Sequence, residues 1–280
     1  MAVRPLTDEE VATYRAEGVV KLPGFVDGSL VAEMLDALDH RMANPGPYGY
    51  TNLYTQDRCF ALDYPVLRRY VLDPTLGQNA ARAMNSERAR FFFDHLFAFA
   101  PQTVVEDHYW HQDQPYWPVQ GEQIVSFWLA LTPCTPETSA LKFVSGSHRA
   151  ERCYPPLGFD GQPLRSDLGP LADQAVDVRD QFLDSQPPPY HLDPAANGVI
   201  EFGYEPGDAV MFHTKLVHSS GGNSSPDARR VAYSIRSIGD DATMILRQGV
   251  FQDPALLPDP DEVFEVGAPM VSRRWPVVHG

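Results

Sequence analysis

The sequence is short of cysteine, of basic residues and of long hydrophobic segments. Its three cysteines, Cys59, Cys134 and Cys153, form no CxxC motif and cannot all pair with one another, so neither a disulfide scaffold nor a thiolate zinc site is expected. The 22 basic residues against 37 acidic ones leave a net charge of −15, the wrong sign for binding a phosphate backbone. We therefore expect buried or incidental thiols and no nucleic-acid partner.

A membrane partner is not expected either. The best apolar run, residues 124–131, is far shorter than the roughly 20 residues that a spanning helix needs. The opening MAVRPLTDEE has no apolar segment after its single arginine, unlike a secretory signal. We expect a soluble cytoplasmic protein, and the 280 residues, 43% of them hydrophobic, are enough to bury a sizeable core.

Residues 1 to about 90 are predicted to form a helical preface. Thr7 and Glu10 have capping-box spacing, which predicts a short helix to about residue 17 with Val11 and Tyr14 on one face. A strand-like GVVKLPGF follows. After Ser29, apolar residues recur at helical spacing and indicate a second helix; they are Leu30, Met34, Leu35 and Leu38.

From residue 91 the pattern changes to short apolar or alternating runs separated by proline and glycine. Six strands are predicted, at FFFDHLFAFAP, HYWHQD, IVSFWLALTP, ALKFVSG, VIEFGYEPGDAVMFH and RRVAYSIRSIG. Strands without intervening helices favour an antiparallel sandwich or barrel over βαβ units. We expect one domain over residues 1–280: a core at about 91–245, a lid-like insertion at about 150–197 and a C-terminal extension at 246–280.

His111 and Asp113 in WHQD are candidate metal ligands. In a strand, residues i and i+2 point to one face, so an imidazole and a carboxylate could reach the same ion. A second HxD, His191-Leu192-Asp193, lies among prolines, which do not suit a central strand. The aromatic, strand-like surroundings of WHQD favour the first pair.

A facial site of two histidines and one carboxylate needs a third ligand from another strand. In GDAVMFHTKLVHSSGGN, His213 and His218 both lie near the close of a strand, with opposite parity. Only one of them can face the site unless the strand bulges. Spacing by itself does not choose between them.

Several segments together resemble the phytanoyl-CoA dioxygenase family of Fe(II)- and 2-oxoglutarate-dependent oxygenases. They are LTDEEVATYRAEGVVKLPGF, the WHQD stretch, the GSHR turn at 146–149, and PGDAVMFHTKLVHSSGGN followed by RR. The resemblance covers most of the chain. It implies a mainly β fold, the double-stranded β-helix or cupin-like jelly roll, with the N-terminal helices packed on the barrel.

The resemblance also implies roles for single residues. The distal histidine of the family's VHxSG segment corresponds to His218, which with His111 and Asp113 would bind Fe(II). An arginine eleven residues after this histidine, here Arg229, would grip the far carboxylate of 2-oxoglutarate, since a guanidinium matches a carboxylate bidentately. Beside the co-substrate the resemblance places Trp128 and Ser220.

Two neighbouring expectations concern the co-substrate pocket. Relatives often carry a lysine where this chain has Ala100, so binding of 2-oxoglutarate would depend more on Arg229. Arg230, next to it, would point the other way in a strand and is expected to be a solvated charge.

The substrate, a small molecule, is expected between the iron and the insertion. Phe212 and Tyr233 share parity with His218 and Arg229 on their strands, and relatives use matching positions near the substrate. The expected pocket residues are Trp117, Phe212, Tyr233 and Asp94.

The favoured reaction is hydroxylation of an unactivated C–H bond in a metabolite or natural-product intermediate, with O₂ as oxidant and ascorbate as an in vitro stimulant. Asp113 occupies the position that related halogenases fill with Gly or Ala, which argues against chlorination. Two alternatives stay open: a cupin-type metal-dependent isomerase or hydrolase without 2-oxoglutarate, and a non-catalytic binding relative. Arg229 argues against the first, and the complete triad argues against the second.

Overall fold

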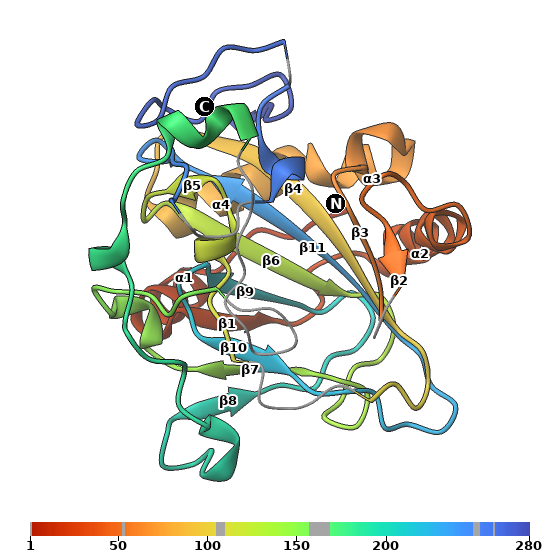
Figure 1. Ribbon diagram of the computed structural model, residues 1–280. Helices are drawn as coiled ribbons and strands as arrows, with labels where there is room; N and C mark the ends of the chain where they lie inside the picture. The colour runs from red at the N-terminus through yellow and green to blue at the C-terminus, as the bar shows by residue number, and fades with distance from the viewer. Residues whose placement is uncertain (1, 52–53, 105–109, 157–168, 249–252, 260) are drawn as a thin grey trace.

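The computed structural model describes the chain except residues 1, 52–53, 105–109, 157–168, 249–252 and 260 (Figure 1). The strands are β1 Val19–Leu22, β2 Tyr50–Thr51, β3 Thr55–Arg58, β4 Ala89–Phe99, β5 Val119–Gln120, β6 Ile124–Ala130, β7 Leu141–Val144, β8 Val199–Glu201, β9 Ala209–His213, β10 His218–Ser220, β11 Arg230–Ile238, β12 Thr243–Met244 and β13 Val277–His279. The helices are α1 Asp8–Glu17, α2 Gly28–Ala43, α3 Pro65–Val71 and α4 Pro74–Met84, with short 3₁₀ turns η1 Ala61–Asp63, η2 Gln114–Tyr116, η3 Ser147–Arg149, η4 Gly169–Gln174, η5 Arg179–Gln181, η6 Tyr190–Leu192 and η7 Pro254–Leu256.

Two antiparallel sheets form the predicted jelly roll. The main sheet has the order β1-β9-β6-β11-β4-β3-β2, with β13 also paired to β4, and the smaller sheet has the order β10-β7-β8. Figure 1 shows the smaller sheet below the main one. The mainly β, antiparallel fold expected from the sequence is confirmed.

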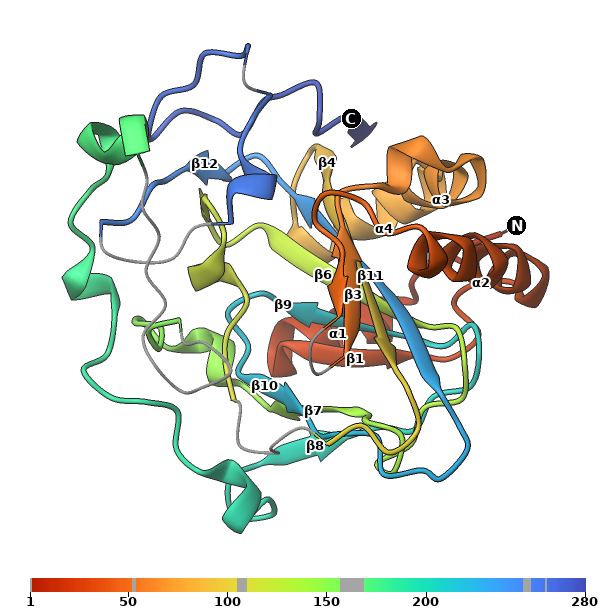
Figure 2. The same cartoon turned by 45° about the vertical axis from the view of Figure 1, so that its right-hand side comes forward.

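Helices cover one face of the main sheet, as Figure 2 shows for α2, α3 and α4. The predicted capping box is present: Glu10 N–H donates to Thr7 Oγ1, and Thr7 N–H donates to the Glu10 carboxylate. The second helix begins at Gly28, two residues earlier than expected, because the Asp27 side chain accepts from Ser29 N–H and caps it. Helices α3 and α4 were not predicted.

The central strands are buried on both faces, and their alternation sorts side chains into two compartments. On β6, Val125 and Phe127 join the core beneath the helices, while Trp128 belongs to the cluster inside the barrel. On β11, Tyr233 packs beneath the helices. Successive strand residues face opposite sides, so the position of the helices decides which parity faces the site.

Two of the predicted strands differ from the structure. VIEFGYEPGDAVMFH contains two strands, β8 and β9, in different sheets. In HYWHQD the described residues are not a regular strand: His111 makes a single β-bridge, and Asp113 has helical backbone angles (φ −68°, ψ −48°) at the start of η2.

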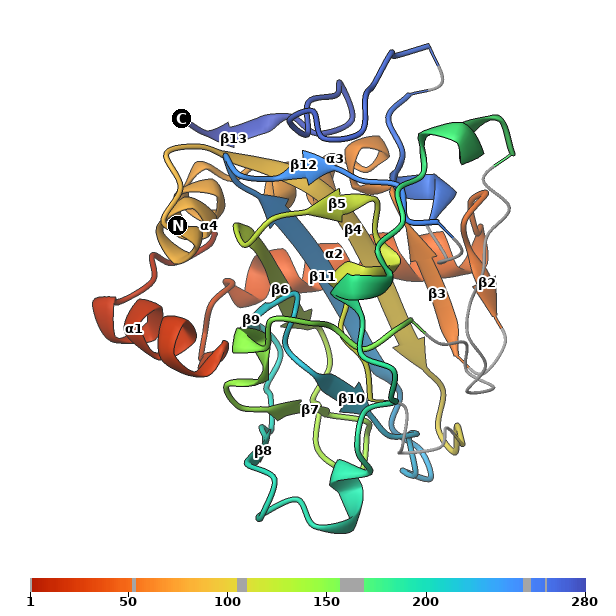
Figure 3. The same cartoon turned by 60° about the vertical axis from the view of Figure 1, so that its left-hand side comes forward.

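The described part of the insertion, residues 150–156 and 169–197, lies on the side of the barrel away from α2 and α3 (Figures 2 and 3). Its described part consists of loops and the turns η4, η5 and η6. Tyr190 packs edge-on against Trp110, with ring centroids 5.2 Å apart, and Tyr154 N–H donates to Gln112 Oε1 at 2.8 Å. The insertion therefore contacts the WHQD segment directly.

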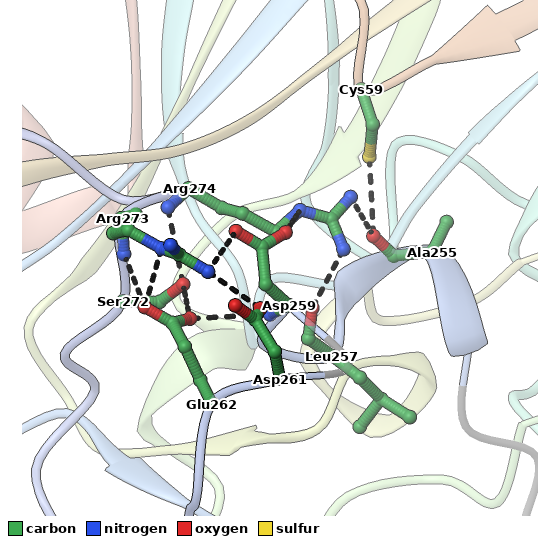
Figure 4. Close-up of polar contacts among 9 residues, drawn as sticks. All are labelled: Cys59, Ala255, Leu257, Asp259, Asp261, Glu262, Ser272, Arg273 and Arg274. Atoms are coloured by element: carbon green, nitrogen blue, oxygen red, sulfur yellow. Dashed lines mark hydrogen bonds and ion pairs between the residues drawn. The ribbon is translucent and has the colours of Figure 1, made fainter.

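The C-terminal extension folds back onto the main sheet, where β13 pairs with β4. Figure 4 shows how its loop is held: Arg274 donates to the carbonyls of Ala255 and Leu257, each at 2.8 Å, and the Cys59 thiol also lies near the Ala255 carbonyl, at 3.6 Å. Acidic side chains surround the adjacent Arg273.

All three cysteines are free thiols, as expected. Within the described residues, none of the helices combines the length and the apolar character required to cross a bilayer.

Candidate active site

The structure brings His111, Asp113 and His218 together at one point inside the barrel. One ligand atom from each lies within 4.8 Å of the others, and Asp113 Oδ1 is 3.8 Å from Nε2 of both histidines. Two imidazoles and one carboxylate on a single side match a facial metal site with open positions.

The two histidines are held side by side by their backbones. His111 N–H donates to the His218 carbonyl at 3.0 Å, and His218 N–H donates back to the His111 carbonyl at 2.9 Å. Their ring centroids are 4.3 Å apart. Strand alternation was expected to bring the ligand side chains to one face. Instead, this bridge and the turn into η2 at Asp113 bring them together.

The hydrogen bonding of His218 sets its tautomer. Its Nδ1 lies 3.0 Å from the carbonyl oxygen of Leu216, and a carbonyl can only accept, so Nδ1 carries the proton. In the neutral ring, Nε2 is then the nitrogen with the free lone pair, and it faces Asp113. A backbone carbonyl behind a histidine is a common way to orient a metal ligand.

His213 lies outside this group. Its Nε2 is 3.2 Å from the Glu122 carbonyl, and its Nδ1 accepts from Lys215 N–H at 3.1 Å. Burial lowers the pKa of His213 to about 3. The chain turns between β9 and β10, so the two histidines belong to different sheets and the parity comparison between them does not apply.

The expected position of Arg229 is wrong. Its guanidinium is on the outside of the protein, where it makes a two-hydrogen-bond ion pair with Asp39 on α2, at 2.7 and 2.9 Å. The two side chains are 47% and 40% exposed. Arg229 lies just before β11, and its parity is that of Tyr233, which faces the helices.

Arg230 occupies the interior instead, and it is 2% exposed. Its guanidinium lies over the rings of Phe99 and Trp128, at 4.2 and 5.5 Å, and Nη2 donates to the carbonyl and the hydroxyl of Ser139. Burial lowers the pKa of Arg230, and across the described residues no carboxylate pairs with it. An enclosed cation without an anion is costly, so this position suits an anionic ligand.

Trp128 and Ser220, expected beside the co-substrate, lie on inward faces. Trp128 belongs to the interior cluster and is the ring next to Arg230. Ser220 pairs with Leu141 on β7, two positions from His218 and therefore on the same face of β10.

The expectation that Tyr233 and Asp94 face the substrate is wrong. Tyr233 packs against Phe60 and Tyr70 beneath the helices. The Asp94 carboxylate accepts from the backbone N–H groups of Phe60 and Ala61, and burial raises its pKa to about 6. Both residues do lie on the same side of the main sheet as Arg229, as expected, but that side faces the helices and not the site.

Phe212 and Trp117 face inward, and their contact with a substrate stays a prediction. The Phe212 ring is 5.0 Å from that of His218. Trp117 is 5% exposed and packs edge-on against Phe93, at 5.1 Å.

Other inward residues were missed by the sequence analysis. His95, on β4, has its Nε2 3.1 Å from Gln56 Oε1, and its ring centroid is 4.0 Å from that of Phe97. Burial keeps the pKa of His95 well below the usual range. Arg236, on β11, reaches Asp113. Arg236 has the same parity as Arg230 on β11, and His95 has the parity of the β4 residues paired with them. These positions can be recognised as facing the site only when the inward face is known.

Comparisons with known proteins agree with this geometry. A family model described as phytanoyl-CoA dioxygenase (PhyH) matches residues 14–231. The ectoine dioxygenase of Sphingopyxis alaskensis is 23% identical over 243 residues, covering 82% of this chain and 76% of that protein. Two solved structures from nogalamycin biosynthesis resemble the fold: the non-heme α-ketoglutarate-dependent epimerase SnoN (TM-score 0.72, 20% identity, 98% of both chains) and the carbocyclase SnoK (0.71, 23%, 97% and 96%).

Proposed function

The chain belongs to the phytanoyl-CoA dioxygenase family, and from that premise we propose that it is an Fe(II)- and 2-oxoglutarate-dependent oxygenase of a small molecule, as one domain over residues 1–280. The observation that carries the proposal is the combination, inside one barrel, of a His-Asp-His triad and a buried arginine without a carboxylate partner among the described residues. The two groups have complementary requirements: the ligand types of the triad suit a cation, and the buried guanidinium suits an anion.

The triad fits Fe(II). His111, Asp113 and His218 would bind it from one side and leave the other positions for the co-substrate and O₂. Bound there, the iron would supply O₂ activation coupled to the oxidative decarboxylation of 2-oxoglutarate. A solved structure of the similar ectoine dioxygenase EctD contains 2-oxoglutarate and 5-hydroxyectoine, and another contains iron.

Arg230 takes the role that the family resemblance had given to Arg229. Its guanidinium would bind the far carboxylate of 2-oxoglutarate, held in place by Ser139 and by the rings of Phe99 and Trp128. Ser139 itself has a left-handed backbone (φ 72°) and donates to the Gly221 carbonyl. A strained residue that supports a buried charge is typical of a functional site.

Hydroxylation is the proposed reaction. Asp113 fills the carboxylate position, so the site has the ligand set of a hydroxylase and not of a halogenase. Epimerisation and ring closure are the reactions named for SnoN and SnoK, and for this chain they are outcomes of the test. A cupin-type isomerase or hydrolase would have no use for the buried Arg230.

The test is a 2-oxoglutarate consumption screen with Fe(II), ascorbate and panels of metabolites, followed by mass spectrometry. We expect succinate formation that depends on one substrate and a product that gains one oxygen. Under ¹⁸O₂, one labelled oxygen should enter succinate and one should enter the product. A product of unchanged composition would indicate epimerisation instead, and a product that has lost two hydrogens would indicate ring closure. The absence of 2-oxoglutarate binding to the iron-loaded protein would contradict the proposal.

A further inference from the structure

Arg236 lies directly behind the carboxylate of the triad. Its side chain is 4% exposed, and Nη2 is 3.4 Å from Asp113 Oδ2. The other oxygen, Oδ1, faces Nε2 of His111 and His218. The two oxygens of Asp113 therefore have different partners, one toward the metal position and one toward the guanidinium.

The surroundings of Arg236 hold its guanidinium in place. It lies over the rings of Phe93 and Trp117, at 4.8 and 5.3 Å, and among the described residues Nε and Nη1 have no hydrogen-bond partner. Aromatic faces attract these nitrogens but accept no conventional hydrogen bond from them. The two rings therefore hold the guanidinium of Arg236 against the carboxylate of Asp113.

A local irregularity of β4 contributes to the aromatic surroundings of Arg236. Arg236 pairs with Phe93 but Ser237 pairs with Phe91, so Phe92 is an extra residue in β4. Both Phe92 and Phe93 then belong to the cluster around Trp117. Bulges often redirect a side chain beside an active site; here Phe93 lies directly across from Arg236, and the bulge brings the extra residue, Phe92, into the same cluster.

We propose that Arg236 is a positioning residue for the metal site: it holds the outer oxygen of Asp113, so that Asp113 binds iron through one oxygen and leaves the remaining positions open. This inference rests on the proposed metal site. Without Arg236 the Asp113 carboxylate would be free to rotate: Oδ1 would no longer be held toward the two histidines, which weakens the site, and Oδ2 could take a position needed by the co-substrate. Partners of this kind typically change metal affinity 10- to 100-fold.

The test uses the metal-free full-length protein and Co(II), whose d–d absorption reports coordination number. Arg236→Met should weaken Co(II) binding about 10- to 100-fold and change the intensity of the d–d bands. Arg236→Lys, which keeps a charge and a donor, should bind Co(II) more tightly than Arg236→Met. If Arg236→Met does not fold, Arg236→Gln carries the same expectation.

Arg41→Met is a matched control. Arg41 also pairs with an aspartate, Asp57, at 2.6 Å and lies over an aromatic ring, Phe60, at 4.6 Å, but Asp57 is not part of the triad. This variant should lower the melting temperature and leave Co(II) affinity and absorption unchanged. If Arg236→Met or Arg236→Gln behaved like Arg41→Met, the inference would be overturned. A wild-type protein that binds no Co(II) would instead contradict the proposed function.

Discussion

At the scale of single residues, Arg229 and Arg230 show how much one position in a strand matters. Neighbouring strand residues point to opposite faces. Arg229 is consequently at the surface with Asp39, whereas Arg230 is enclosed beside Trp128. Two residues of the same type therefore have opposite surroundings, and we expect a loss of co-substrate affinity from removing Arg230 but not from removing Arg229.

Arg230→Ala should weaken 2-oxoglutarate binding by two or more orders of magnitude. Removing one partner of a buried charge pair typically costs about 3–5 kcal/mol, and the co-substrate carboxylate would be left without its cation. Titration of the Fe(II)-loaded protein with 2-oxoglutarate measures this effect.

Arg229→Ala is the control for that experiment. It removes an exposed ion pair, which contributes about 1 kcal/mol or less, and the affinity for 2-oxoglutarate should not change. Equal losses in the two variants would mean that neither arginine is the specific anchor.

At the scale of elements, Gln112 connects the insertion to the barrel. Its Nε2 donates to the Lys215 carbonyl at 2.6 Å, between β9 and β10, and its Oε1 accepts from Tyr154 N–H at 2.8 Å. Gln112 lies between His111 and Asp113, so the residue between these two members of the triad attaches the loop.

Gln112→Ala should loosen the insertion. It leaves the Tyr154 N–H and the Lys215 carbonyl without this partner, at a cost of about 1–3 kcal/mol. Limited proteolysis should then cut within residues 150–197 faster than in the wild type. Gln120→Ala, at an exposed position of β5, should be cut at the wild-type rate. An unchanged cleavage rate in Gln112→Ala would show that other contacts, such as Trp110 with Tyr190, hold the insertion.

At the scale of the whole molecule, buried histidines make stability depend on pH. Burial lowers the pKa of His213 to about 3 and holds that of His95 well below its usual range. The unfolded chain takes up these protons near pH 6.5, while the folded protein does not. The contribution of His213 is therefore fully present above about pH 6.5 and is lost as the pH falls toward 3, and His95 acts in the same direction. Asp94 has the opposite effect on stability: burial raises its pKa to about 6, so its contribution to the free energy of unfolding increases as the pH falls from about 6 to 4.

His213→Asn should make the free energy of unfolding depend less on pH between 7 and 5. The asparagine oxygen can still accept from Lys215 N–H, which His213 Nδ1 now does, but the side chain no longer titrates. Urea unfolding at several pH values measures the slope. His40→Asn, at an exposed position, should keep the wild-type slope, and a wild-type slope in His213→Asn as well would contradict the explanation.

Loading the site should also stabilise the fold. A ligand that binds only the folded state at 100 times its Kd contributes about 2.7 kcal/mol. Fe(II) with 2-oxoglutarate, under anaerobic conditions, should therefore raise the melting temperature, and a chelator should reverse the rise. His218→Ala should show no rise, because it removes one of the three ligands at the triad. A rise of wild-type size in His218→Ala would place the metal elsewhere.

Local patterns in the sequence were sufficient for several features. The capping box at Thr7, the antiparallel strand runs after residue 91 and the ligand types of His111, Asp113 and His218 all appear in the structure. Each of these depends on neighbours a few residues away, or on a residue type that a metal requires. The family resemblance added the identity of the distal histidine, between two that spacing left equal.

The tertiary structure alone decided which face of each strand is inside. Parity says that Arg229 and Tyr233 lie together and that Arg230 and Arg236 lie together, but not which pair faces the barrel. That choice depends on where α2 to α4 pack and on the register of β11 between β4 and β6. A shift of one residue sends every side chain of a strand to the other face. The sequence could therefore name the three residues that meet in the triad, whereas the burial of Arg230, the proposed carboxylate anchor, came only from the fold.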